Sequence, residues 1–135
     1  MANGLYDKAR EAFLSAGINW SADSLMVVLV DKTKYTVNLA TDQYLSSIIS
    51  AARVATSTAL AAKTVTAGVA DAGDVTFPAV TGAASGALVI YKSTGTDSTS
   101  PLIAYIDVAT GLPVTPNGGD ITVAWDNGAN KIFKL

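Results

Sequence analysis

Residues 86–108, "GALVIYKSTGTDSTSPLIAYIDV", hold two strongly apolar runs separated by a loop of Ser, Thr, Gly and Asp. Runs of this length predict β-strands, but both are too apolar on both faces for half-exposed strands. A β-sandwich has one core between its two sheets, so the second face of such strands needs another cover. We expect that cover to come partly from a helix and partly from contacts between protein molecules.

The amino-terminal segment predicts a short helix over residues 4–16. Apolar residues recur there at helical spacing while charged residues fill the other face. Asn3 can cap the amino end of the helix, and Gly17 can end it. We interpret residues 1–17 as a helical segment that covers one face or edge of a sheet, rather than as a helix that binds a partner.

Further strands are predicted where apolar residues alternate with polar ones or form short runs between turn residues. These strands are 25–31, 35–39, 63–70, 74–80 (stopped by Pro78) and 120–125, the last forming a terminal hairpin with 130–135 around Asn127 and Gly128. A turn is expected at 31–34 and a loop or helical turn from Thr41. Residues 48–62 fit either a helix or a meandering sheet edge.

These elements predict a mainly β fold, an antiparallel β-sandwich or a jelly-roll-like barrel with a short N-terminal helix, in which residues 1–135 form a single domain. The residues expected to form the core are Leu25, Val27, Leu29, Val65, Val75, Phe77, Leu88, Ile90, Ile103, Ile106, Ile121 and Val123.

The composition argues against several classes of function. The chain has no Cys and no His, which removes disulfides, imidazole bases and the usual zinc sites. Its net charge is −2 and it has no cluster of Lys or Arg, so we expect no nucleic-acid partner. No apolar run is long enough to cross a membrane, and the amino terminus does not resemble a secretory signal. We expect no enzyme activity, no cofactor, no metal site and no small-molecule substrate.

Two weaker signals have simpler interpretations. Asp71 and Asp74 could contribute to a calcium site, but a polar turn between strands explains them better. Trp20 and Trp125 could form platforms for a sugar, but core packing explains them equally well.

Four segments in order resemble a family of small structural proteins encoded in the head and tail gene clusters of tailed bacteriophages. They are "LYDKAREAFLSAGINWSADSLMVVLVD", "AAKTVTAGVADAGDVTFPAV", "GALVIYKSTGTDSTSPLIAYIDV" and "GGDITVAW". The similarity covers nearly the whole chain except about 32–60. The resemblance implies a capsid decoration, or cement, protein that binds the outer surface of the head and bridges subunits of the major capsid protein. A tail or neck component, or a carbohydrate-binding module of a host-recognition apparatus, is the alternative.

The same interpretation predicts a homo-oligomer, either a dimer or a trimer, that is assembled in the host cytoplasm and resides on the virion surface. Loops and termini are where a sandwich usually meets its partners. The expected contacts therefore come from the amino-terminal segment, the polar-aromatic stretch 35–44, and the loops 93–100 and 111–119. The predicted interface residues are Leu5, Tyr6, Tyr35, Tyr44, Thr96, Asp97, Leu112 and Pro113.

Overall fold

The computed structural model describes residues 3–109, 111–126, 128–129 and 131–135. A five-stranded sheet lies at its centre, in the order β1–β8–β7–β2–β3, and each pair of neighbours is antiparallel. The strands are β1 (Gly4–Leu5), β2 (Leu25–Val30), β3 (Arg53–Thr56), β7 (Ala87–Lys92) and β8 (Leu102–Ile106).

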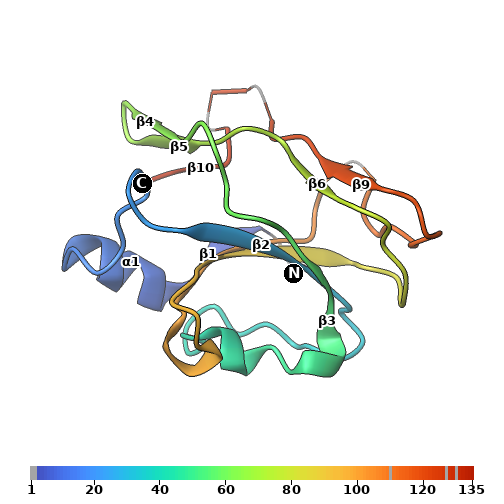
Figure 1. The fold of residues 1–135 in the computed structure, drawn as a ribbon. Coiled ribbons are helices and arrows are strands. Elements are labelled where there is room, and N and C mark those ends of the chain that lie inside the picture. Colours follow the sequence, from blue (N-terminus) through green and yellow to red (C-terminus); the bar gives the residue numbers. More distant parts are fainter. Residues whose placement is uncertain (1–2, 110, 127, 130) are drawn as a thin grey trace.

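Two smaller sheets form a second layer above the central sheet (Figure 1). One has the order β10–β5–β4 and the other pairs β6 with β9. Their strands are β4 (Thr64–Thr66), β5 (Val69–Asp71), β6 (Val75–Phe77), β9 (Ile121–Val123) and β10 (Phe133–Lys134). The predicted mainly β, sandwich-like fold is confirmed, whereas the described strands do not close into a barrel.

The single α-helix of the described residues, α1 (Asp7–Leu14), is shorter than the predicted 4–16 and packs against β8. It begins late because Gly4 and Leu5 pair with β8 instead of entering the helix. Asn3 does not cap it: the Oδ1 atom of Asn3 accepts hydrogen bonds from the backbone N–H groups of Asp107 and Val108, both at 2.9 Å. Asn3 therefore fastens the start of the chain to the end of β8.

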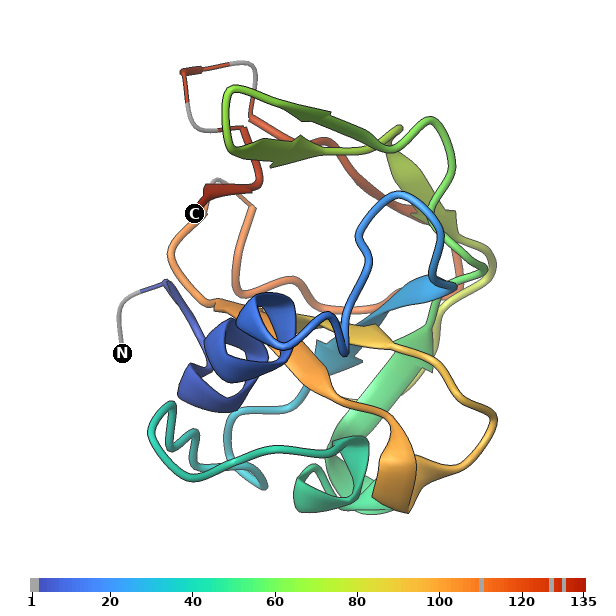
Figure 2. The ribbon, with the colours of Figure 1, turned by 90° about the vertical axis from the view of Figure 1, so that its left-hand side faces the viewer.

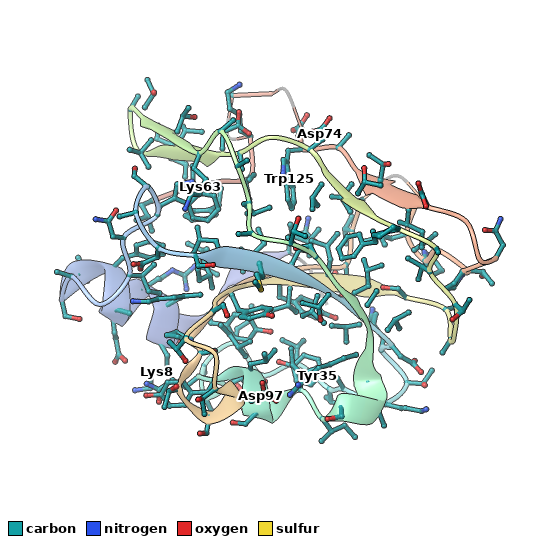
Figure 3. All side chains as sticks on the ribbon, in the orientation of Figure 1. Lys8, Tyr35, Lys63, Asp74, Asp97 and Trp125 are labelled. Carbon is teal, nitrogen blue, oxygen red and sulfur yellow. The ribbon has the colours of Figure 1, made fainter. Side chains whose placement is uncertain are left out.

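Both faces of the central sheet are buried within the chain. Leu29, Leu88 and Ile106 lie opposite one another across β2, β7 and β8 and therefore share the face toward the small sheets. Val28, Val89 and Tyr105 share the other face in the same way. Figure 3 shows Trp125 on the first side of the sheet and Tyr35 on the second.

The second face is covered by residues 31–52, which include two 3₁₀ turns, η1 (Leu45–Ser47) and η2 (Ser50–Ala52). Tyr35, Leu45 and Ile48 of this segment are buried, and the ring of Tyr35 lies 6.5 Å from the ring of Tyr105. The expectation that contacts between protein molecules must cover these strands is therefore wrong. Burial of β7 and β8 gives no reason to expect an oligomer.

Two of the predicted strands differ in the structure. Residues 35–39 form no strand, and Tyr35 packs beneath the central sheet without pairing with a neighbouring strand. Residues 63–70 contain two strands, β4 and most of β5, separated by a turn at Ala67 and Gly68 with φ angles of 53° and 76°. Val65 on β4 is 58% exposed and is not a core residue.

The predicted terminal hairpin is also wrong. Strand β9 pairs with β6, and β10 pairs with β5, so the two strands join different sheets. Asn127, the expected turn residue, lies outside the described residues. The ambiguous stretch 48–62 contains η2 and the edge strand β3, which confirms the alternative of a sheet edge.

The rest of the predicted core is confirmed. Strand β6 ends at Phe77, before Pro78, as expected. The predicted residues that are buried are Leu25, Val27, Leu29, Val75, Phe77, Leu88, Ile90 and Ile103, and those partly buried against them are Ile106, Ile121 and Val123.

Candidate interaction surface

Three of the predicted interface residues lie in the core. Leu5 and Tyr35 are buried, and Tyr6 has no exposed area at all. Side chains with so little exposed area cannot form an interaction surface, so the prediction for these three residues is wrong. The sequence around these residues is polar and loop-rich, and it does not indicate that their side chains pack against the central sheet.

Tyr6 and Tyr35 instead form a buried chain of hydrogen bonds. Their hydroxyl oxygens lie 2.9 Å apart, and the Tyr35 hydroxyl donates to the Asp42 carboxylate at 2.7 Å. Burial raises the pKa of both tyrosines above the usual range, and the pKa of Tyr35 is raised further by the neighbouring Tyr6 hydroxyl. The chain of hydrogen bonds therefore fastens segment 31–52 beneath the central sheet while both hydroxyls are neutral.

Three other predicted residues, Tyr44, Thr96 and Asp97, come together at one end of the molecule. Tyr44 forms an isolated β-bridge with Pro101, and the Leu45 N–H donates to the Ser100 carbonyl at 2.9 Å. We call the surface formed by residues 43–50 and 93–100 the loop end. It lies below the central sheet in Figure 1, on the side away from the small sheets.

Arg53 holds the two segments of the loop end together. Its Nε donates to the Ile48 carbonyl at 2.8 Å, and one terminal nitrogen donates to the Leu45 carbonyl at 3.0 Å. The other terminal nitrogen binds the Asp97 carboxylate at 2.6 Å. The planar guanidinium thus joins the two carbonyls at η1 to loop 93–100, which a lysine ammonium could not do with the same geometry. Sequence reasoning missed Arg53, because an isolated arginine in an Ala-rich stretch gives no signal.

Hydroxyl groups fix the conformation of loop 93–100. The Thr94 and Thr99 hydroxyl oxygens lie 2.6 Å apart, and the Ser100 hydroxyl donates to the Thr96 carbonyl at 2.8 Å. Such side chain–backbone bonds order a loop before it meets a partner, so less conformational entropy is lost on binding.

The exposed part of the loop end combines apolar and hydroxyl groups. Ile49 is 54% exposed between the two 3₁₀ turns, and the half-buried Tyr44 lies close by in the sequence. Thr96 is exposed, and the charge of Asp97 is paired with Arg53. A rigid, nearly neutral surface of this kind suits contact with another protein rather than with a charged polymer.

Leu112 and Pro113 do not belong to the loop end. They precede Val114, which forms a β-bridge with Ser85 just before β7, whereas loop 93–100 follows β7. The two sites therefore lie at opposite ends of one strand, and the predicted interface residues do not form a single surface. Leu112 is half-buried and Pro113 is exposed.

An apolar groove lies between α1, the loop that follows it, the β4–β5 hairpin and β10. Its cavity has a volume of about 410 Å³ and is lined by Phe13, Trp20 and Phe133. The Phe133 ring lies 5.2 Å from Trp20 in an edge-to-face arrangement and 6.0 Å from Phe13. Val65 and Leu135, 58% and 61% exposed, also line the groove. We call it the aromatic groove; sequence reasoning missed it because its residues come from distant segments.

A second cavity, of about 660 Å³, lies between the β1–β8 edge and the residues around β10. Its floor includes Leu5, Ala104 and Trp125, and Arg10, Asp126, Lys131 and Lys134 also line it. This lining of apolar residues and of charges of both signs does not indicate a particular chemical reaction.

The other candidate sites lack the required geometry. Trp20 and Trp125 are 4% and 8% exposed, so neither indole presents a platform to a sugar. In the part of the chain that the structure describes, no three Asp or Glu side chains gather where they could hold a metal ion. No helix among the same residues has the length and hydropathy needed to span a membrane.

No protein-family model matches the sequence, and no curated protein matches it either.

Proposed function

We propose that this protein is a structural component of a tailed-bacteriophage virion that decorates the capsid and binds the major capsid protein. The observation that carries the proposal is the ordered resemblance of its sequence segments to small phage head and tail proteins. These segments supply α1, β2 and β4–β9, so the resemblance extends over both layers of the fold rather than over one motif.

The loop end is the surface that we propose for docking on the capsid. It is held in one conformation by Arg53 and by the hydroxyl groups of loop 93–100. Its exposed Ile49 and half-buried Tyr44 can bury apolar area, which contributes more to affinity than exposed ion pairs do.

Quantification of virion proteins tests the proposed role. Purified particles are analysed by gel densitometry or mass spectrometry, and the amount of this protein is compared with that of the major capsid protein. A decoration protein is expected in hundreds of copies per particle. A few copies would support the alternative of a tail or neck component and contradict decoration.

Binding to undecorated capsids tests the proposed docking surface. At a protein concentration below saturation, Ile49→Lys is expected to reduce the amount of protein bound to capsids at least about tenfold. A loss of this size is typical of a residue at the centre of an interface. Val108→Lys is the matched control, because Val108 is similarly exposed but lies outside the loop end. If Leu112→Lys abolishes binding while Ile49→Lys does not, docking occurs at the other end of β7 and the assignment is wrong.

A further inference from the structure

Strand β4 is the outer strand of sheet β10–β5–β4, and all three of its residues are exposed. Exposed edge strands usually carry a charge, a proline or a bulge that prevents pairing with another chain. The sequence of β4 is Thr-Val-Thr, and its register against β5 is regular from Thr64 to Thr66. Strand β4 itself therefore carries no charge, proline or bulge, although it is short and Lys63 precedes it.

The backbone of Val65 points toward the open side of the edge. Val65 lies opposite Ala70, and the Ala70 carbonyl accepts a hydrogen bond from Ile132 N–H on the β10 side, at 3.2 Å. In an antiparallel pair, residues that face each other alternate between hydrogen-bonded and non-hydrogen-bonded positions. The two-residue turn at Ala67 and Gly68 makes the flanking residues a hydrogen-bonded pair, which places Val65 in a non-hydrogen-bonded one.

We propose that two copies of this chain associate by antiparallel pairing of their β4 strands about a two-fold axis at Val65. In this register each Val65 N–H donates to the Val65 carbonyl of the other copy. Thr64 of each copy lies opposite Thr66 of the other, so the palindrome Thr-Val-Thr pairs every residue with a compatible one. The association does not rest on the proposed virion role.

The charges at this edge are compatible with the pairing. Lys63 of one copy would face Ala67 of the other, so no two like charges lie opposite each other. The Lys63 ammonium is already hydrogen-bonded to the Asp23 carbonyl, and the Asp71 carboxylate lies 3.6 Å from the Lys131 ammonium. The pairing therefore does not require either charge to lose its present contact.

The pairing would also bury apolar surface. Directly opposed residues of antiparallel strands share a face, so the two Val65 side chains would lie side by side. Val65 lines the aromatic groove, and the two grooves would join into one apolar channel across the axis. Figure 2 shows the β4–β5 hairpin at the outer margin of the molecule, where a second copy can reach it.

An edge of this length predicts a weak association. Three residues a side bury less than the roughly 1,000 Å² that a stable interface needs. We therefore expect a monomer–dimer equilibrium that depends on concentration, and no larger closed ring, because the two-fold contact uses the same edge in both copies.

Sedimentation equilibrium over a concentration series tests the proposal with Val65→Pro. Proline removes the Val65 N–H but not the hydrogen bonds between β4 and β5, because that N–H faces the open edge. The variant is expected to raise the dimer dissociation constant at least about tenfold. Val108→Lys is the control. Val108→Pro is not used, because proline would remove the N–H that donates to the Asn3 side chain.

Cross-linking tests the register independently of Val65→Pro. The chain has no cysteine, so Val65→Cys introduces the only thiol. Opposed residues in a hydrogen-bonded antiparallel pair have Cα atoms about 5.5 Å apart, within the range of a disulfide. Mild oxidation should give a covalent dimer from Val65→Cys but not from Val108→Cys, and protection of the Val65 amide from exchange should rise with concentration.

The proposal is overturned if the wild-type protein stays monomeric at the highest concentration reached. It is also overturned if Val65→Pro folds and dimerises like the wild type, or if the main species is a trimer. Should Val65→Pro fail to fold, as judged by circular dichroism, equal cross-linking of Val65→Cys and Val108→Cys would still refute the register.

Discussion

The indole N–H groups of Trp20 and Trp125 donate to carbonyl oxygens of the same short segment, Trp20 to Asp71 and Trp125 to Gly73, each at 3.0 Å. This segment joins β5 to β6 and therefore connects the two small sheets of the upper layer. The backbone N–H of Trp125 also donates to the Asp74 carboxylate at 3.2 Å. The residues that could have suggested calcium or sugar binding thus hold the two sheets in place.

Replacing Trp20 or Trp125 by Phe is expected to lower the free energy of unfolding by about 1–3 kcal/mol each, because a partly buried carbonyl loses its donor. The two effects should not add, since both indoles fix one segment. Urea denaturation of the two single variants and the double variant measures this coupling. Val108→Ala, at an exposed position, should stay within about 0.5 kcal/mol of the wild type.

Arg53→Lys should destabilise the loop end more than Asp97→Asn does. Lysine keeps the charge but cannot reach both the Leu45 and Ile48 carbonyls, whereas Asp97→Asn removes only a half-exposed ion pair. We expect a loss of about 1–3 kcal/mol for the first variant and less than about 1 kcal/mol for the second. Hydrogen exchange at residues 45–50 localises the effect, and equal losses would show that the ion pair dominates.

Stability should fall as the pH rises above about 10. In the unfolded chain tyrosine has a pKa near 10, whereas burial raises the pKa of Tyr6, Tyr35 and Tyr105 in the folded protein. Above pH 10 the unfolded state therefore binds fewer protons, and the free energy of unfolding falls by about 1.4 kcal/mol per pH unit for each tyrosine. Denaturant midpoints between pH 8 and pH 11 should show a shallower slope for Tyr35→Phe.

Acid should remove a contribution made by Asp31. Hydrogen bonds from the Thr33 hydroxyl, at 2.7 Å, and from the Thr33 amide, at 2.9 Å, lower the pKa of this carboxyl. The contribution is present above the unfolded pKa, about 3.9, and is lost as the pH falls through the lower folded value. Asp31→Asn should be less stable than the wild type at neutral pH but lose less stability on acidification. Parallel acid titrations of the two proteins would contradict this.

The strands with continuous apolar runs could be predicted from the sequence, because β2, β7 and β8 have no other way to bury their side chains. The β4–β5 hairpin could not, since the alternation of "KTVTAGVA" continues through the turn at Ala67 and Gly68. The pairing of β10 with β5 could not be predicted either, because a nearby turn signal favoured the local partner. Local patterns specify that a strand forms, but its neighbour depends on packing across the whole fold.

This limit affected the prediction of interface residues more than the prediction of the fold. Tyr44, Thr96 and Asp97 were found because loops commonly carry contacts, but Tyr6 and Tyr35 looked equally exposed in a polar sequence. Only the three-dimensional structure shows that the sheet needs their rings on its second face. Arg53 gave no sequence signal, because its role depends on backbone carbonyls of another segment. Val65 was predicted as a core residue from strand alternation, but it lies on an open sheet edge instead.

The order of strands in the central sheet also bears on biosynthesis. Strand β2 pairs with β7 over its whole length, from Leu25 opposite Lys92 to Val30 opposite Ala87, so it cannot complete this pairing before β7 has been synthesised. Strand β1, at the start of the chain, pairs with β8, which comes later still. A nascent chain on the ribosome therefore carries an apolar strand that cannot be enclosed until residues near 106 have left the exit tunnel. We expect truncated products that end before β7 to aggregate or be degraded rather than to accumulate as folded fragments.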